Sequence, residues 1–337
     1  MIAASFPVVF FLTLLAMVVG GNKFLKDWGF ETVIFSLLIG LFISNIFSIP
    51  KWLKEALSSE LFVKIGLVLL GTTVLFDDLL KAGALGLIQS CVVVFTVWNF
   101  CFWLCRKMKI DKEMSLMLSS AVSICGVSAA VATAGAIKGD KTKLSYVVSL
   151  VLVVAVPMIL IMPGLAKLMG LPEDMAGAWI GGTIDTTGAV AATGAIYGEV
   201  ALQTSTIVKF SQNVLLGVAA FLISIYWSYS KKEVTEEKPT LKVIWLRFPK
   251  FVLGFVAASL VFSFCVAPEV VSDAKPILKN IQGMWFALAF MSIGLETDFK
   301  SLITSENRRS TYAFLGAQAF NVVFTLLVAW ILFGLIA

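Results

Sequence analysis

The sequence predicts an all-α integral membrane fold, a single polytopic domain over residues 1–337 with about 11 transmembrane helices. Three observations predict it. Hydrophobic residues make up 59% of the chain and charged residues 14%, against roughly 45–50% and 25% in soluble domains. The mean hydropathy is +0.95. The apolar residues also form long runs, close to the ~20 residues that a helix needs to cross the hydrocarbon core.

Each apolar run is predicted to be a helix, because a backbone in contact with lipid must satisfy its hydrogen bonds within its own segment. The predicted spans cover residues 5–20, 29–49, 61–76, 83–105, 114–137, 144–166, 175–198, 203–229, 244–267, 281–297 and 310–335. The first run lacks the basic region and the cleavage site of a signal peptide, so it is expected to remain as a span.

The connections between the spans differ in positive charge. Numbered along the chain, the even connections contain sixteen Lys and Arg residues and the odd connections contain eight. The positive-inside rule then places the even connections and the N-terminus in the cytoplasm, and the C-terminus outside. The longest polar stretch, residues 228–250, becomes a cytoplasmic linker between spans eight and nine.

Several kinds of chemistry are not expected. The chain has no histidine, which is the commonest metal ligand and the side chain that titrates near neutral pH. Its five cysteines lie in apolar runs without a C-x-x-C pair, so they are predicted to be small buried side chains. Motifs of nucleotide hydrolysis and of membrane hydrolases do not occur, so an enzyme is not expected. Basic residues are scattered between apolar runs, which argues against nucleic acid as a partner.

Two pairs of segments repeat within the chain. LGTTVLFDDL at residues 70–79 and IGLETDFKSL at residues 293–302 end the third and the tenth span. Those spans have opposite orientations, as inverted repeats require, although helix-end chemistry that recurs by chance is the alternative. TAGAIKG at 133–139 and ATGAIYG at 192–198 end spans that point the same way, which does not fit an inverted repeat.

Two spans are crowded with small and hydroxyl-bearing residues, at 115–139 and 177–198. This composition predicts discontinuous helices, and ordinary close helix packing is the alternative. Within the first span, a break at Gly126 would turn the following backbone amides toward an anion. The site residues predicted around this break are Ser123, Cys125, Gly126 and Ser128.

Asp185 lies midway in the second of these spans, and a carboxylate there costs about 2.5–3.5 kcal/mol on insertion scales. One hypothesis is a Na⁺ site formed with Thr186 and Thr187, with Thr183 nearby, because hard cations prefer oxygen ligands. A second is that Asp185 carries a proton, because burial disfavours its charged form. A structural pair with Lys209 is the alternative to both.

Lys209, Gln212 and Asn213 form a polar patch one turn long on the next apolar span. Lys209 would neutralise Asp185 or hold an anionic substrate, and a lysine that reaches to the membrane interface is the alternative. Four acidic residues at span ends are expected to be solvated or interfacial caps, with gating as the alternative. They are Asp77, Asp78, Glu296 and Asp298.

Three motifs in this order, SICGVSAAVATAGAI, AGAWIGGTIDTTGAVAATGAIYG and TIVKFSQNVLLG, resemble the YeiH-type sulfate exporter family of bacterial inner membrane proteins. The resemblance covers most of the chain. It implies a transporter with inverted repeats, broken helices, and a core and a panel domain, distantly akin to bile acid:sodium symporters and cation/proton antiporters. Many members have His at the position of Asp185, Asp at Thr186 and Arg at Gln212, so this chain lacks cationic character that would suit sulfate.

These observations predict an ion-coupled secondary transporter of a small solute in the bacterial inner membrane. The solute is expected to be a sulfate-like oxyanion or a small organic anion, with Na⁺ or H⁺ as the coupling ion and alternating access around residues 115–139 and 177–198. The lipid bilayer and the solute are the expected partners, and a homo-oligomer is compatible with the sequence. The alternatives are a Na⁺/H⁺-type cation exchanger, which the lack of Arg in the polar spans favours, and a passive channel or membrane scaffold.

Overall fold

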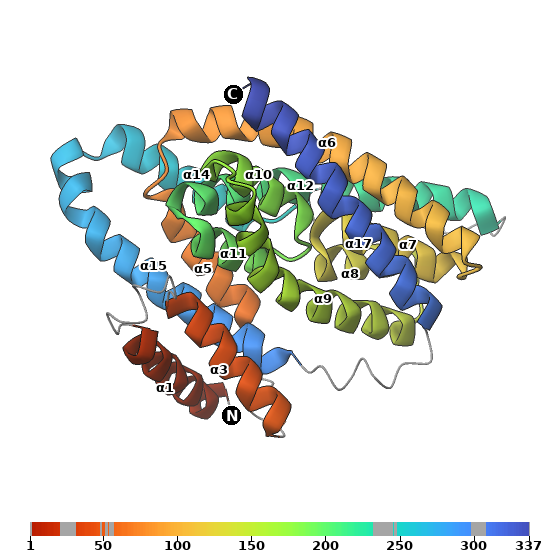
Figure 1. The fold of residues 1–337 in the computed structure, drawn as a ribbon, viewed down its shortest axis with the longest axis horizontal. Helices are drawn as coiled ribbons and strands as arrows, with labels where there is room; N and C mark the ends of the chain where they lie inside the picture. Colours follow the sequence, from red (N-terminus) through yellow and green to blue (C-terminus); the bar gives the residue numbers. More distant parts are fainter. Residues whose placement is uncertain are drawn as a thin grey trace.

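The computed structural model describes residues 2–20, 32–47, 49–50, 53, 57–231, 245, 248–297 and 308–336, and every regular element within them is a helix (Figure 1). Most of the predicted linker at 228–250 and the acidic residue Asp298 lie outside the described residues. The prediction of an all-α fold is therefore confirmed for the part of the chain that the structure describes.

Each predicted span overlaps one helix or two consecutive helices. Two spans do not cross from end to end: Lys143 pairs with Asp111 at 2.8 Å across the ends of span 114–137, and Glu173 accepts a hydrogen bond from the Val200 amide at 2.9 Å across the ends of span 175–198. The prediction of full transmembrane helices was therefore wrong for these two spans, because the chain turns back within each of them. The helices are α1 (Ile2–Gly20), α3 (Thr32–Ile46), α5 (Ser59–Gly71), α6 (Phe76–Lys107), α7 (Lys112–Ser120), α8 (Val127–Ile137), α9 (Lys141–Leu168), α10 (Glu173–Thr183), α11 (Thr187–Tyr197), α12 (Glu199–Lys231), α14 (Phe251–Leu260), α15 (Pro268–Glu296) and α17 (Arg308–Ala329). Three π-helical segments continue α7, α14 and α17: η1 (Ala121–Cys125), η2 (Val261–Cys265) and η3 (Trp330–Ile336).

Four stretches are long and apolar enough, by length and composition, to cross a membrane. They are α6, α9, residues 199–227 of α12, and α17 with most of η3. Shorter apolar helices accompany them, among them residues 6–20, 35–46 and 251–265. A multi-pass membrane protein follows, because these apolar surfaces need lipid around them.

The ends of the long helices carry charges that suit the helix dipole. The first turn of α6 contains Asp77 and Asp78, both exposed, and its last turn contains Arg106 and Lys107. These two aspartates are exposed at a helix end, in agreement with the prediction of solvated or interfacial caps. Asp140 starts α9 by accepting hydrogen bonds from the Thr142 and Lys143 amides at 2.7 and 3.0 Å, which is the usual chemistry of a helix N-cap.

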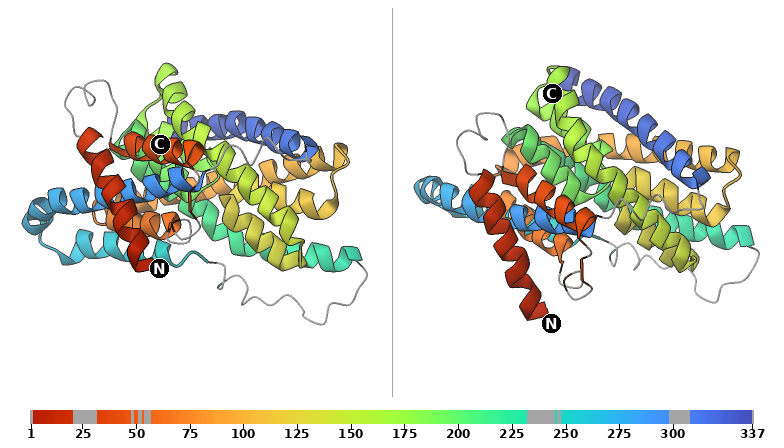
Figure 2. Two further views of the ribbon diagram at one scale, coloured as in Figure 1. Left: turned by 90° about the horizontal axis from the view of Figure 1, so that it is seen from below. Right: turned by 60° about the horizontal axis from the view of Figure 1, so that its bottom comes forward.

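The helices form two groups (Figures 1 and 2). The first, which we call the α5–α15 group, contains α1, α3, α5, α14 and α15 and lies toward the left of Figure 1. Phe62 of α5 packs on Trp285 of α15 with ring centroids 5.8 Å apart. The second, which we call the α6–α12 group, contains α6 to α12 and α17, and stacking of Phe100 on Phe320 at 4.0 Å joins α6 to α17.

Small residues let α10 lie against α12 with almost no space between their backbones. A Cβ atom added at Gly177 would lie 2.7 Å from the Ala201 carbonyl oxygen, and one at Gly181 would meet the Ser205 carbonyl oxygen. This spacing of two glycines four residues apart is typical of close helix pairs in membranes. The prediction of close packing through small residues therefore describes α10, in addition to the helix breaks described below.

Three of the five cysteines, Cys101, Cys105 and Cys125, are buried as predicted. Cys91 and Cys265 are exposed on the protein surface, so the prediction of burial was wrong for these two. The reason is that an apolar run in a membrane helix faces lipid on one side and protein on the other, so its composition does not separate the two faces.

Candidate functional site

The helix that starts at α7 is interrupted at Gly126, which has φ 59° and ψ −112°. This φ is one that side-chain-bearing residues rarely adopt. A Cβ atom at this position would also lie 2.7 Å from Val151 Cγ1 and 3.2 Å from Asp185 Cβ. The predicted break at Gly126 is present, and it lies directly against the segment that carries Asp185.

A second interruption separates α10 from α11. Ile184 and Thr186 have extended backbones, with ψ 133° and 140°. Thr186 then starts α11, since its side chain accepts a hydrogen bond from the Ala189 amide at 3.3 Å. Both spans that are rich in small residues are therefore discontinuous, and their breaks meet in the interior of the α6–α12 group.

Lys209 connects the two breaks. Its ammonium donates hydrogen bonds to the Ile124 carbonyl at 2.5 Å, to the Ile184 carbonyl at 2.8 Å and to Gln212 Oε1 at 2.9 Å. The side chain is 1% exposed, so it does not reach to the membrane interface. Both carbonyls lie at helix carboxyl ends, where the backbone dipoles favour a cation.

Side-chain amides satisfy further carbonyls at these carboxyl ends. Gln212 Nε2 donates to the Gly182 carbonyl at 3.0 Å. From α17, Gln318 and Asn321 both donate to the Thr183 carbonyl, at 3.0 and 3.1 Å, and Asn321 also donates to Val122 O at 3.2 Å. The sequence prediction did not include these two α17 residues. Two amides three residues apart in an apolar span would have been the signal.

Asp185 is 2% exposed, and neither of its carboxylate oxygens has a hydrogen-bond partner. Thr183 Oγ1 on the same segment is also buried without a partner. The ion pairs found within 4.0 Å among the described residues do not include Asp185 with Lys209. The predicted structural pair of these two side chains is therefore absent, because Lys209 is held by carbonyl groups.

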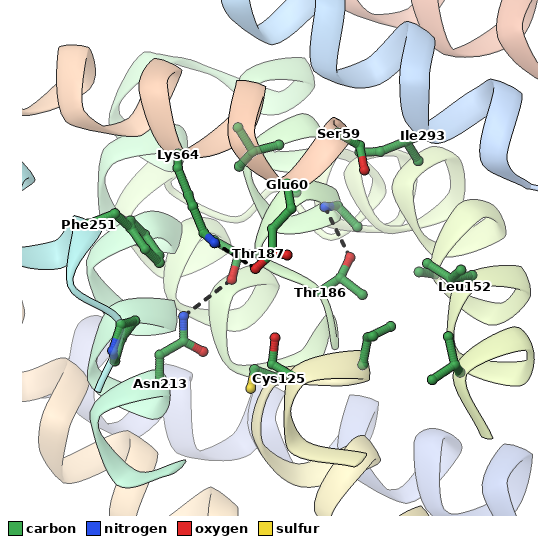
Figure 3. A pocket seen from close by; sticks show the side chains of 18 of the residues that line it. Ser59, Glu60, Lys64, Cys125, Leu152, Thr186, Thr187, Asn213, Phe251 and Ile293 are labelled. Carbon is green, nitrogen blue, oxygen red and sulfur yellow. Dashed lines mark hydrogen bonds and ion pairs between the residues drawn. The ribbon is translucent and has the colours of Figure 1, made fainter. Parts of the chain in front are cut away.

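A cavity of about 670 Å³ lies between the two helix groups (Figure 3). The residues at the start of α8 and of α11 line it, and so does Asn213, which donates a hydrogen bond to Thr187 Oγ1 at 3.2 Å. Five of the predicted site residues line the cavity: Cys125, Ser128, Thr186, Thr187 and Asn213. Six are not among the lining residues: Ser123, Gly126, Thr183, Asp185, Lys209 and Gln212.

The opposite wall of the cavity comes from the α5–α15 group. Lys64 forms an ion pair with Glu60 at 2.8 Å, and Figure 3 shows both side chains pointing into the cavity near Thr187. Glu296 also lines the cavity and accepts a hydrogen bond from Ser59 at 2.7 Å. The prediction of a solvated or interfacial cap was wrong for Glu296, because its side chain lies at the cavity and is bonded by Ser59 of α5. Glu60 and Lys64 were missed, although a lysine inside an apolar run was a visible signal.

The possible metal-ligating side chains that line the cavity are hydroxyls, carboxylates, the Asn213 amide and the Cys125 thiol. Among the described residues there is no group of three or more His, Cys, Asp or Glu side chains that could hold a metal ion. In the predicted Na⁺ site, Thr186 and Thr187 line the cavity but Asp185 does not. The Thr186 and Thr187 hydroxyl oxygens also already accept hydrogen bonds from the Ala189 amide and from Asn213.

The protein family described as Conserved hypothetical protein 698 matches residues 5–313. The chain belongs to this family. The resemblance to the YeiH-type family, which also carries the designation UPF0324, is confirmed by this match and by the relatives of the chain.

A UPF0324 membrane protein of Rhodopirellula baltica is 40% identical, over 99% of this chain and 63% of its own length. One from Nitratidesulfovibrio vulgaris is 38% identical over 97% of this chain and 59% of its own, and one from Nitrosomonas europaea is 30% identical over 83% and 66%. The chain thus spans about three fifths of the length of the first two relatives. No solved structure matches it.

Proposed function

We propose that the protein is an ion-coupled secondary transporter of a small anion. The observation that carries the proposal is the junction of two interrupted helices, where the buried Asp185 carboxylate has no partner and the two following helices begin at one cavity. Broken helices that meet around a substrate and a coupling ion are a recurrent design of secondary transporters.

Asp185 is the proposed coupling residue. An ionised carboxylate without hydrogen bonds inside a protein is strongly unfavourable, so the side chain either carries a proton or is paired with a cation. Either state can couple to an ion gradient, because binding and release of H⁺ or Na⁺ changes the charge at the junction. Lys209 is assigned a structural role, since its three donors are all used by Ile124, Ile184 and Gln212.

The proposed transport step is alternating access, in which the α5–α15 group moves against the α6–α12 group around the cavity. Similar contacts at the two predicted repeat segments support it. In each case, a serine on the helix that precedes one predicted repeat segment donates a hydrogen bond to a backbone carbonyl of the other segment. Ser44 of α3 donates to the Gly294 carbonyl of α15 at 2.9 Å, and Ser259 of α14 donates to the Val74 carbonyl beyond α5 at 2.7 Å. The α5–α15 group corresponds to the panel domain and the α6–α12 group to the core domain.

The proposal is tested by anion uptake into proteoliposomes under an imposed Na⁺ or H⁺ gradient. Uptake should depend on one of the two gradients, and Asp185→Asn should abolish that dependence while the protein remains folded. Thr193→Val is a matched control, because this buried hydroxyl on α11 bonds only the Ala189 carbonyl of its own helix, at 2.7 Å. Normal gradient-driven uptake by Asp185→Asn would remove Asp185 from the mechanism.

A cation exchanger without an anionic substrate is the second candidate. The carboxylates of Glu60 and Glu296 in the cavity favour it, because carboxylate oxygens are the usual ligands of hard cations. The same proteoliposomes separate the candidates. Exchange of Na⁺ for H⁺ without any added anion supports the exchanger, and a requirement for an anion supports the transporter proposed first.

A further inference from the structure

We infer that the cavity binds an organic monoanion with a short apolar tail, in preference to an inorganic dianion such as sulfate. The inference rests on the proposed transport function and names its substrate class. The geometry that points to it is a cavity with a hydrogen-bonding end formed by two helix amino termini and an apolar wall formed by α9.

The hydrogen-bonding end lies where α8 and α11 begin. Each of these helices has 11 residues, and Ser128, Thr187 and Gly188 near their first turns line the cavity. The first backbone amides of a helix have no carbonyl partner within it and attract an anion. Asn213 donates to Thr187 Oγ1, so the Thr187 hydroxyl keeps its own proton for a ligand.

Asn213 gives a second, independent indication of a ligand. The residue is 4% exposed, lines the cavity, and its Oδ1 atom is buried without a hydrogen-bond partner. Figure 3 shows the side chain directed toward the middle of the cavity, below Thr187. A buried amide oxygen without a partner is unfavourable. A hydroxyl substituent beside the acid group of the ligand would satisfy it.

A third side of the cavity is apolar. It consists mostly of side chains on one face of α9: Val148, Leu152, Ala155, Val156 and Ile159. Leu216 and Ile293 extend it from α12 and α15. The volume of about 670 Å³ is typical of a site for a small organic molecule, for which ~300–1,000 Å³ is usual. Sulfate has no apolar surface to place against this wall.

The charges around the cavity favour a single negative charge on the ligand. Lys64 and Lys250 are balanced by Glu60 and Glu296 among the lining residues, and Lys64 is already paired with Glu60. The cavity therefore has no surplus of formal positive charge to offset the desolvation of a dianion, which is much larger than that of a monoanion.

The test is calorimetric titration of the full chain in nanodiscs with acetate, butanoate, hexanoate, dodecanoate, 1-butanesulfonate and sulfate. Affinity should rise about fourfold for each methylene group from acetate to hexanoate. Butanesulfonate should bind more tightly than sulfate by at least about tenfold, since its butyl chain is buried. Sulfate that binds as tightly as butanesulfonate, or affinity that does not change with chain length, would overturn the inference. Affinity that keeps rising through dodecanoate would indicate a lipid site and would also overturn it.

Two variants with matched controls separate the head and the tail of the ligand. Leu152→Ala should weaken hexanoate binding about tenfold and leave acetate binding unchanged, because it shortens the apolar wall. Leu160→Ala is the control, since Leu160 lies on α9 but is 41% exposed and is not among the lining residues. Thr187→Val should weaken all the carboxylates alike, and Thr193→Val on the same helix should not. An equal loss of acetate and hexanoate binding in Leu152→Ala would contradict the assignment of the tail.

The same measurements distinguish failure of this inference from failure of the proposed function. Chain-length-dependent binding without gradient-driven uptake would support the ligand class and contradict the transporter. Gradient-driven uptake of sulfate by a protein that does not bind hexanoate would support the transporter and overturn the ligand class.

Discussion

The two sides of the helix junction are stabilised in opposite ways. On one side, the carboxyl ends of η1 and α10 have their carbonyls bonded by Lys209, Gln212, Gln318 and Asn321. On the other side, the amino ends of α8 and α11 begin at a cavity. The donors on the first side come from two different helices, α12 and α17. On the second side, α11 is capped by Thr186 of its own segment, and α8 has no side-chain cap.

This difference separates the part of the junction that stabilises the fold from the part that is available to bind a ligand. Helix carboxyl ends that are buried need donors, and a lysine with three N–H groups satisfies them within the protein. Helix amino ends that open onto a cavity keep backbone amides that a ligand can use. Asp185 lies between the two sides with no partner on either, which is why it is the proposed coupling residue.

The largest expected effect on stability comes from removing the donor that bonds the carboxyl ends of η1 and α10. Lys209→Met should destabilise the protein by about 3–5 kcal/mol, because it leaves buried carbonyls without donors and removes a buried charge from its partners. The free energy of unfolding can be measured by denaturant titration in mixed micelles. Lys279→Met is the control, since Lys279 is 57% exposed and pairs with Glu199 at the surface; a loss below about 1 kcal/mol is expected there. Equal losses for the two variants would contradict the structural role of Lys209.

The second effect tests the turn that separates the two sides. Gly126→Ala should destabilise the protein by about 1–3 kcal/mol, because it forces a side chain into a backbone conformation that alanine rarely adopts. The added methyl group would also meet Val151. Gly164→Ala in α9, where a Cβ atom would meet nothing within 4 Å, should instead be neutral or stabilise the helix by up to ~1 kcal/mol. The unfolding free energies of the two variants should therefore change in different directions.

A third prediction compares the buried Lys209 with a partly exposed lysine, Lys143, near the start of α9. Lys143 donates to Asp111 at 2.8 Å and to Glu113 at 3.0 Å. Burial alone would raise the pKa of Asp111, but hydrogen bonds from Lys143 and from the Met114 amide outweigh it and hold that pKa below its ordinary value.

A carboxyl group whose pKa is lowered by folding stabilises the protein above its unfolded pKa, and this contribution disappears as the pH falls through the folded pKa. We therefore expect stability to decrease on acidification below about pH 4. Lys143→Met should reduce that decrease by only about 0.5 kcal/mol, because the pair is partly exposed. The measurement is the midpoint of thermal unfolding as a function of pH. A loss as large as that of Lys209→Met would contradict the distinction between the two lysines.

The smallest effect on stability is expected where the amino ends of α8 and α11 meet the cavity. Ser128 lines the cavity at the start of α8 and is exposed to it. Ser128→Ala should change the free energy of unfolding by less than ~0.5 kcal/mol and still weaken the binding of carboxylates. Ser149→Ala is the control, because Ser149 is partly exposed on α9, does not line the cavity, and bonds the Ser145 carbonyl of its own helix. A large loss of stability in Ser128→Ala would assign a structural role to this side as well.

Much of the fold could be predicted because long hydrophobic runs indicate which segments form helices in a membrane. The composition of residues 177–198 predicted a break in that span, and the structure has one at Ile184–Thr186. For Lys209 the sequence offered three roles, a pair with Asp185, an anion site or the membrane interface. None was the one observed, because the carbonyls that it binds come from two other helices. Glu296 was misassigned for the same reason, since only the position of α15 beside α5 brings it to the cavity.

What the sequence by itself determined was membrane residence, the order of the spans and the two helix breaks, because hydrophobicity and local backbone preference are properties of adjacent residues. The tertiary structure alone decided that Lys209 bonds carbonyls, that Asp185 is left without a partner, and that Glu60, Lys64 and Glu296 face the same cavity as Thr187. Those relations join residues on different helices, and the way helices pack is set by side-chain shape across the whole bundle and not by any one segment.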